Sequence, residues 1–202
     1  MARSKKNSLT QALPSLSLEN GCWECTIALP SWTGFQSRRG PYGSLDSQNV
    51  SDGSTQLSIS PPDDGESPPS GEQAAAYSYL VAHHQSIRDQ ILAAVLKEFP
   101  RFRARFYEIE SPSESFPTVN RLEDLRNVLG LTNVLIHTVI LEDVAYVGYE
   151  FGCAWDAEHG LGAMTHRDRI VALGGADTAI LEWIAERDVK RLRKKVRKPT
   201  SR

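Results

Sequence analysis

Residues 146–175, YVGYEFGCAWDAEHGLGAMTHRDRIVALGG, determine much of the fold of this chain. Apolar side chains alternate with polar or small ones up to residue 153, and shorter alternating stretches follow at 161–165 and 169–173. A period of two is typical of strands with one buried face. The stretch therefore predicts a three-stranded meander. Its first turn, residues 155–160, holds the densest group of polar side chains in the chain.

The first strand of this meander has two different faces. One face carries the side chains expected in the core, namely Ala145, Val147, Tyr149, Phe151 and Cys153. The opposite face carries Tyr146, Gly148, Glu150 and Gly152. Because glycine has no side chain, the face around Glu150 is low and open. We expect it to admit a helix, a neighbouring backbone or a partner.

Three further strands are expected, at 22–32, 55–60 and 133–141. The stretch at 133–141 is apolar on both faces, which indicates a strand in the centre of the sheet. Cys22 and Cys25 belong to the first of these strands, where residues three apart point to opposite faces. The two thiols are therefore not expected to share a metal ion.

Three helices are expected. A long helix over 72–99 begins at the capping pair Ser70 and Gln73 and stops or kinks at Pro100. A short helix is expected over 121–129, and a last helix is expected to start at Asp177. The predicted buried stripe of this last helix is Ile180, Leu181, Trp183 and Ile184.

These elements predict an α+β fold in which an antiparallel sheet, made of the C-terminal meander and the N-terminal strands, packs against one long helix and two shorter helices. The expected organisation is a flexible arm at 1–20, a single domain at 21–187 and a basic tail at 188–202. Within the domain, residues 41–70 contain many Ser, Pro, Gly and acidic residues and predict a mobile acidic loop with one short strand in it.

Composition narrows the class of protein. The formal net charge is −2, which argues against a surface built for nucleic acid or for an anionic membrane. Three cysteines suit a reducing compartment better than a disulfide scaffold. Since no apolar run approaches the length of a spanning helix, we expect a cytoplasmic protein that does not engage a membrane.

The turn at 155–160 is the candidate site. Asp156, Glu158 and His159 could bind a divalent cation or act in acid–base chemistry, while His166 would lie on the order of 20 Å from His159 along an extended strand. Trp155 and Glu150 complete the candidate binding surface. A purely structural role is the alternative, because Asp156 can close a turn and Trp155 can cover the core.

The basic tail offers a weaker candidate. It holds eight Lys or Arg residues between Lys190 and Arg202, which could contact phosphates. It has no interleaved aromatic residues for base stacking. Nucleic acid is therefore not an expected partner, and a solvated helix end explains the tail.

Three segments of the chain resemble an uncharacterised bacterial domain family, one of the domains of unknown function. They are residues 147–162 (Val-Gly-x-Glu-Phe-x-Cys-x-Trp-Asp-x-Glu-His-Gly-Leu-Gly), 72–80 (Glu-Gln-Ala-Ala-Ala-Tyr-x-Tyr-Leu) and 171–177 (Val-x-x-Gly-Gly-Ala-Asp). The specific part is Trp155, Asp156, Glu158, His159, Gly160, Leu161 and Gly162. The resemblance implies a fold and no activity. Proteins of this kind are similar to small partners encoded near bacterial toxins, including immunity proteins.

Two functions of different classes are therefore carried forward. The first is a non-enzymatic protein-interaction domain without a cofactor, indicated by the acidic loop, the open strand face and the lack of nucleophile, phosphate or dinucleotide motifs. The resemblance implies an immunity-type protein that binds and neutralises a toxin. The alternative is a metal-dependent, hydrolase-like enzyme that uses Asp156, Glu158 and His159.

Overall fold

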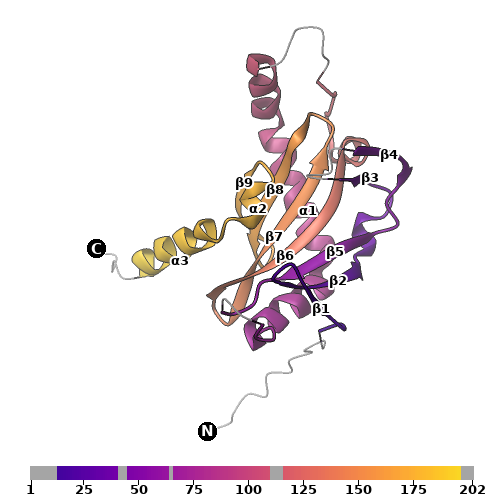
Figure 1. Cartoon of the computed structure of the whole chain (residues 1–202). Helices are drawn as coiled ribbons and strands as arrows, with labels where there is room; N and C mark the ends of the chain where they lie inside the picture. Colours follow the sequence, from indigo (N-terminus) through magenta and orange to yellow (C-terminus); the bar gives the residue numbers. More distant parts are fainter. Residues whose placement is uncertain (1–12, 41–44, 64–65, 110–115, 197–202) are drawn as a thin grey trace, which may run out of the picture.

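The computed structural model describes residues 13–40, 45–63, 66–109 and 116–196. In this part of the chain, seven strands form one sheet in the order β1-β2-β5-β6-β7-β8-β9 (Figure 1). Their bounds are β1 Ser17–Glu19, β2 Cys22–Ala28, β5 Ser54–Ile59, β6 Leu129–Leu141, β7 Val144–Cys153, β8 Asp156–His166 and β9 Arg169–Gly174. A separate hairpin consists of β3 Gln36–Arg39 and β4 Leu45–Val50. The predicted strands are present, but the one predicted over 22–32 ends at Ala28, and residues 30–32 form a short 3-10 helix instead. β6 lies at the centre of the sheet.

The sheet is mixed, so the prediction of an antiparallel sheet was wrong at one pair of strands. β5 runs parallel to β6, with Leu57 opposite Val134, whereas the other neighbouring pairs of the described sheet are antiparallel. The chain passes from β5 to β6 through α1, Gly71–Ile109. A helical crossover of this kind returns the chain in the same direction. Alternation identifies a strand but not the direction of its neighbour.

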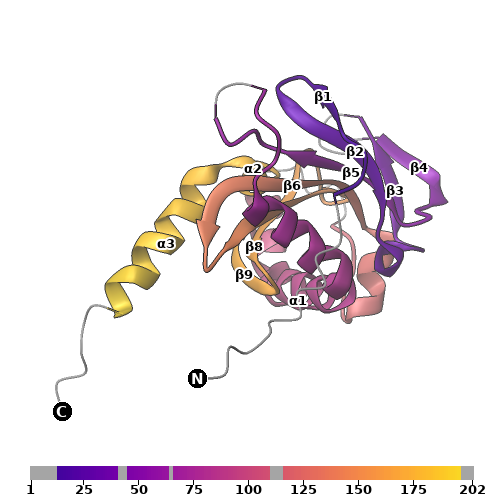
Figure 2. The same cartoon turned by 90° about the horizontal axis from the view of Figure 1, so that it is seen from below.

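The helix α1 covers one face of the sheet (Figure 2). Its predicted capping box is present: the Ser70 backbone N–H donates to Gln73 Oε1 (2.9 Å), and the Gln73 N–H donates to Ser70 Oγ (3.3 Å). The buried Gln73 amide also donates to the carbonyl oxygens of Ser60 (2.7 Å) and His137 (3.1 Å). One side chain thus connects the start of α1 to β6 and to the end of β5.

The stop or kink predicted at Pro100 was wrong. α1 continues through Pro100 to Ile109, and a break in the helical dihedral angles falls instead at His83 (φ −123°, ψ 15°). Beyond Pro100, Phe102 and Phe106 pack against the core. This packing offsets the backbone hydrogen bond that Pro100 cannot donate.

The main core lies between α1 and the sheet. Its buried side chains include Leu80, Ile91 and Val95 from the helix and Leu57, Ile59, Val134, Ile136, Tyr149 and Phe151 from the strands. The N-terminal segment adds Leu29, Trp32 and Phe35 around the short helix η1, Pro30–Trp32. The rings of Trp32 and Phe151 lie 5.2 Å apart, so residues before β5 complete the core.

The strand β6 begins earlier than predicted. The helix expected over 121–129 is a 3-10 helix, η3 Leu122–Asn127, and Leu129 and Gly130 already belong to β6. A Cβ atom on Gly130 would lie 2.3 Å from the carbonyl oxygen of Gln36. Gly130 therefore permits the close approach of β3.

The opposite face of the sheet carries α2, Asp177–Ile180, from which α3, Glu182–Val196, extends away from the body (Figures 1 and 2). A Cβ atom on Gly148 would lie 1.9 Å from the Ala179 carbonyl oxygen. The low face predicted at this glycine is thus filled by the chain's own α2. The single last helix that we predicted is broken at Leu181 (φ −78°, ψ 100°).

The predicted arm and acidic loop contain strands, and the predicted tail begins as a helix. β1 lies inside the arm, β4 lies inside the loop beside the predicted short strand β5, and α3 continues to Val196. Parts of these predictions, residues 1–12, 41–44, 64–65 and 197–202, lie outside the described residues. Among the described helices, none is both long and apolar enough to cross a membrane.

Candidate functional site

The β7–β8 connection carries the predicted site residues. The turn predicted at 155–160 is shorter than expected: Ala154 and Trp155 form it, and Asp156 already begins β8. Asp156 Oδ1 accepts a hydrogen bond from the His159 backbone N–H (2.9 Å) and lies 3.0 Å from Nδ1 of the His159 ring. Gly160 has a φ of 60°, which glycine adopts without steric strain. Asp156 therefore closes the local structure while the His159 ring stays exposed.

Trp155 points into the protein. It is buried among aromatic side chains, with ring centroids 5.2 Å from Phe99, 6.0 Å from Phe102 and 6.3 Å from Phe116. The Phe99 contact is edge-to-face and the Phe102 contact is stacked, both favourable arrangements of aromatic rings. In this arrangement Trp155 joins the turn to the second half of α1.

The other acidic and imidazole groups of the described residues do not form a metal cluster. Glu158 is exposed, and within the described ranges no group of three or more His, Cys, Asp or Glu side chains is arranged to hold a metal ion. His166 is buried, with Nε2 2.9 Å from the Leu141 carbonyl oxygen, and burial lowers the pKa of its ring. The structure thus brings Asp156 and His159 together.

Glu150 belongs to a different polar group. Its Oε2 accepts a hydrogen bond from Asn133 Nδ2 (3.0 Å), and its backbone carbonyl accepts one from the Thr132 hydroxyl (3.0 Å). Burial raises the pKa of Glu150, against the opposite effect of the Asn133 hydrogen bond. These contacts tie Glu150 to β6 rather than to the β7–β8 turn.

A surface that the sequence did not predict lies where α2 meets α3. Ile180, Leu181 and Trp183 are exposed to 43%, 36% and 51%. The guanidinium of Arg187 lies 5.1 Å from the centre of the Trp183 ring. We call these three apolar residues the apolar corner. The helical spacing had predicted that they would be buried.

The sheet contact of α3 explains this exposure. The buried residues of α3 are Ile184, Ala185, Asp188 and Val189, which pack over Tyr146 and Met164 of the strands. The buried face is therefore shifted past Ile184, and the break at Leu181 leaves the preceding residues outside it. Gly148 and Gly162 were the available signal, because they mark where a backbone could approach the sheet closely.

A buried ionic group anchors α3. Asp188 accepts hydrogen bonds from the Tyr146 hydroxyl (2.8 Å), from Arg169 and from Arg191 (2.7 Å). Burial raises the pKa of Asp188, but the bonds from Arg169, Tyr146 and Arg191 outweigh it and hold the pKa below its usual value. Burial and the bond to Asp188 raise the pKa of Tyr146. A charge satisfied in this way fixes α3 against β7 and β9.

A second group anchors the α2–α3 junction. Glu182 Oε1 accepts hydrogen bonds from the Thr138 backbone N–H and hydroxyl, both 2.9 Å, and lies 3.6 Å from His137 Nδ1. Nε2 of the buried His137 ring lies 2.8 Å from the Ala179 carbonyl oxygen. The interactions with His137 and Thr138 lower the pKa of Glu182 to about 2. Polar contacts to β6 therefore hold Ala179, which precedes the apolar corner, and Glu182, which lies within it.

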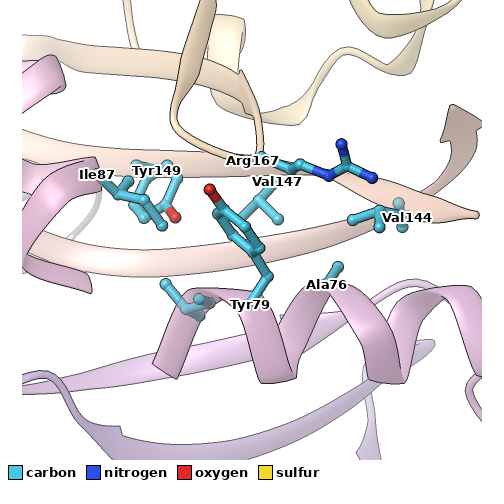
Figure 3. A pocket seen from close by; sticks show the side chains of 9 residues that line it. Ala76, Tyr79, Ile87, Val144, Val147, Tyr149 and Arg167 are labelled. Atoms are coloured by element: carbon cyan, nitrogen blue, oxygen red, sulfur yellow. The ribbon is translucent and has the colours of Figure 1, made fainter. Parts of the chain in front are cut away.

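A crevice between α1 and β7 has a different character (Figure 3). Tyr79 extends from α1 toward the strands, and Tyr149, Val147 and Arg167 also line the crevice. The Tyr149 hydroxyl is buried and has no hydrogen-bond partner among the described residues, and burial raises its pKa. The crevice is too narrow to hold a water molecule, so it offers no room for a ligand as it stands.

A shallow groove of about 260 Å³ lies beside β2, β3 and β5. Hydroxyl side chains dominate its lining, which includes Thr26, Ser37, Ser54 and Thr132, together with Arg38. This lining is polar and includes Thr132 near the start of β6, whereas Ala179 and Glu182 at the apolar corner contact His137 and Thr138 farther along β6. The groove is therefore not an extension of the apolar corner.

The fold and these surfaces define an α+β domain with a mixed sheet. A family model for a domain of unknown function, DUF6985, matches residues 42–181, and the chain belongs to this family. No curated protein and no solved structure matches the chain. The matched residues include the β7–β8 turn and end at Leu181, so Trp183 and α3 lie beyond them.

Proposed function

We propose that this protein is a non-enzymatic interaction domain that binds another protein through the apolar corner. The observation that supports the proposal is the exposure of Ile180, Leu181 and Trp183 within four consecutive residues. Contiguous exposed apolar side chains with a polar surround are typical of protein–protein interaction sites. Tryptophan and arginine are also the side chains that most often dominate binding energy, and Trp183 lies against Arg187.

The fixed position of the apolar corner favours this function. Ala179 lies directly on Gly148, and Glu182 is bound to Thr138. A segment whose backbone is held in place before binding loses less conformational entropy when a partner arrives. The corner therefore has the properties of a preorganised docking surface.

The finer proposal is an immunity-type protein whose partner is a bacterial toxin. It rests on the resemblance of residues 155–162 to an uncharacterised domain family, because proteins of that kind are similar to small partners encoded near bacterial toxins. The test is to express a toxin encoded beside this chain's gene, first alone and then together with this protein. Growth that the toxin alone prevents should be restored when this protein is also present. Substituting Trp183 with alanine should then weaken the rescue, and a rescue that is equally strong without Trp183 would contradict this route of binding.

A metal-dependent hydrolase that uses Asp156, Glu158 and His159 is the alternative proposal. The contact between Asp156 Oδ1 and His159 Nδ1 favours it, because a carboxylate beside an imidazole can hold a divalent cation. Elemental analysis of the purified protein, followed by Glu158→Ala and His159→Ala, tests it. If no divalent metal co-purifies and both variants merely unfold more easily, the enzyme proposal is rejected.

Photo-crosslinking tests the interaction proposal directly. A photoreactive phenylalanine analogue at position 183 should form a crosslink of one defined mass in cells of the natural source. The same analogue at Gln90, which is exposed on α1, should not form that product. Leu181→Asp combined with the label at 183 should reduce the yield. An identical pattern from both positions would argue against a docking surface at the apolar corner.

A further inference from the structure

The exposed face of α3 continues the apolar corner as a row of cations. Trp183, Arg187, Lys190 and Lys194 follow one another at helical spacings of four, three and four, so they share one side of the helix. This side is opposite to the buried residues Ile184, Ala185 and Val189. We call Arg187, Lys190 and Lys194 the basic stripe.

Much of this positive charge has no anionic partner among the residues that the structure describes. Between residues 187 and 196 there are six Lys or Arg residues and one carboxylate, Asp188, which is buried and bound to Arg169 and Arg191. Lys190 pairs with Glu186 at 3.3 Å. Arg193, Lys194 and Lys195 form no salt bridge with any described residue. If the basic stripe binds anything, the negative charge that complements it must therefore be supplied by the bound molecule.

We propose that the apolar corner and the basic stripe together bind an acidic segment of a partner protein. The segment would place one large apolar side chain against Leu181 and Trp183 and run its carboxylates along Arg187, Lys190 and Lys194. This inference rests on the proposed function and adds the chemistry of the partner. An apolar centre with a charged border is the usual layout of an interface between two proteins.

A membrane surface is the less suitable occupant. A helix that lies in a membrane interface needs an apolar face along its length. The apolar face of α3 is instead packed on the sheet through Ile184, Ala185 and Val189. The exposed apolar side chains are confined to the α2–α3 junction, which suits a single inserted side chain.

Nucleic acid is also less suitable. Binding of single strands uses several aromatic side chains that stack successive bases. On the exposed side of α3 only Trp183 is aromatic among the described residues, and Glu186 adds negative charge beside Lys190. The overall charge of −2 does not support binding through phosphates alone.

The experiment is a selection from a random 12-residue peptide library on the full chain. Peptides recovered through this surface should contain several Asp or Glu residues around one large apolar residue. The reversal variant Arg187→Glu/Lys190→Glu/Lys194→Glu should bind these peptides roughly tenfold more weakly or worse, since three exposed ion pairs are lost. When used as the target, the same variant should select Lys- or Arg-rich peptides.

The helix α1 supplies a matched control. Lys97, Arg101 and Arg105 are exposed, and their spacing of four residues also places them in a row. Lys97→Glu/Arg101→Glu/Arg105→Glu makes the same change in net charge, and peptide affinity should remain as in the parent chain. Circular dichroism and thermal unfolding establish that both variants fold.

The outcomes separate the two proposals. If recovered peptides require Trp183 but carry no excess of acidic residues, the acidic partner is wrong while the interaction function stands. If no recovered peptide depends on Ile180, Leu181 or Trp183, the docking surface itself fails, and the inference fails with it. Equal binding of peptide to the reversal variant and to the parent overturns the inference.

Three further measurements exclude other occupants. Trp183 fluorescence and light scattering are measured on three samples. These are the protein with vesicles containing anionic phosphatidylglycerol, the protein with a single-stranded 20-nucleotide DNA, and the protein alone at high concentration. The Trp183→Phe variant identifies the contribution of this residue to the signal. If vesicles, DNA or a second copy of the chain change the Trp183 signal more strongly than the selected peptides do, that occupant replaces the acidic segment.

Discussion

Gly148 shows how one residue determines the position of α2. A Cβ atom placed on Gly148 with ideal geometry would lie only 1.9 Å from the Ala179 carbonyl oxygen, so no residue with a side chain fits there without movement. The same carbonyl oxygen lies 2.8 Å from His137 Nε2. The position of α2 is therefore fixed both by its contact with Gly148 on β7 and by this polar contact with β6. A glycine in mid-strand therefore serves close packing here rather than a turn.

Gly148→Ala should lower the free energy of unfolding by about 3 kcal/mol, the upper end of the range for overpacked sites, because the contact is with backbone that must move. Urea unfolding measures the change. Gly71→Ala is the control: Gly71 has no heavy atom within 4 Å of the added methyl group, and the substitution should be neutral or slightly stabilising. Similar unfolding of both variants would mean that α2 is not held by this contact.

Glu182 makes stability depend on acidity. Its pKa falls from 4.5 to about 2 on folding, so the ionised carboxylate stabilises the folded state. For a lowered pKa this contribution is fully present above the unfolded value and is lost as the pH falls from about 4.5 toward 2. Glu182→Gln should therefore reduce the melting temperature near neutral pH and match the parent chain at the acidic end of this window.

Thermal unfolding across that window checks the prediction. Glu186→Gln is the matched control on the same helix, because Glu186 is exposed and pairs only with Lys190 among the described residues. It should unfold as the parent chain does at every pH. A constant difference between Glu182→Gln and the parent at all pH values would contradict the role of the ionised carboxylate.

At the scale of elements, α3 is the clearest case of a helix held by polar contacts. The buried apolar residues by which α3 packs on the sheet are Ile184, Ala185 and Val189. The buried Asp188 adds hydrogen bonds from Tyr146 and Arg169 to this attachment. Removing one partner of a buried ionic group is strongly destabilising, because the other charge is left unpaired. The attachment of α3 should consequently be sensitive to Asp188.

Asp188→Asn should loosen α3 by about 2 kcal/mol, because the charge-assisted hydrogen bonds from Arg169 and Arg191 are weakened while both guanidiniums stay partly exposed to water. Hydrogen exchange followed by mass spectrometry should show faster exchange over residues 182–196 while β6 and β7 keep their protection. Tyr146→Phe removes one neutral donor and should have a smaller effect, about 1 kcal/mol. Equal exchange in the two variants would show that the charge of Asp188 contributes nothing.

At the scale of the whole molecule, the family match and the cooperative fold have different boundaries. The matched residues 42–181 exclude β2 and η1, yet Leu29, Trp32 and Phe35 are fully buried in the core. β2 is also the antiparallel neighbour of β5, so without it one edge of β5 would lose its partner. We infer that the segment before residue 42 belongs to the folding unit.

A fragment of residues 42–181 should consequently fail to unfold cooperatively. Each large core side chain contributes on the order of 2–5 kcal/mol, and the whole fold is expected to have about 5–15 kcal/mol of stability. A chain of residues 13–196 is the control and should retain a single sharp transition by circular dichroism. A cooperative transition in the shorter fragment would place β2 and η1 outside the folding unit.

Much of the architecture followed from local patterns. Alternation located β5 to β9, the pair Ser70 and Gln73 marked the start of α1, and the glycines of β7 indicated a face open to another element. Each of these features depends on side chains close together in sequence. A period of two, a capping box and an absent side chain have the same consequence in most folds.

The remaining features depended on contacts between residues distant in sequence. The parallel pairing of β5 with β6, the continuation of α1 past Pro100 and the burial of Trp155 each require a partner many residues away. The apolar corner is the sharpest example. Spacing alone placed Ile180, Leu181 and Trp183 on a buried stripe, but the face of α3 that meets the sheet is set by Asp188 binding to Arg169 and Tyr146. An amphipathic pattern shows that a helix has an apolar side, whereas which residues are covered depends on where the rest of the fold offers complementary partners.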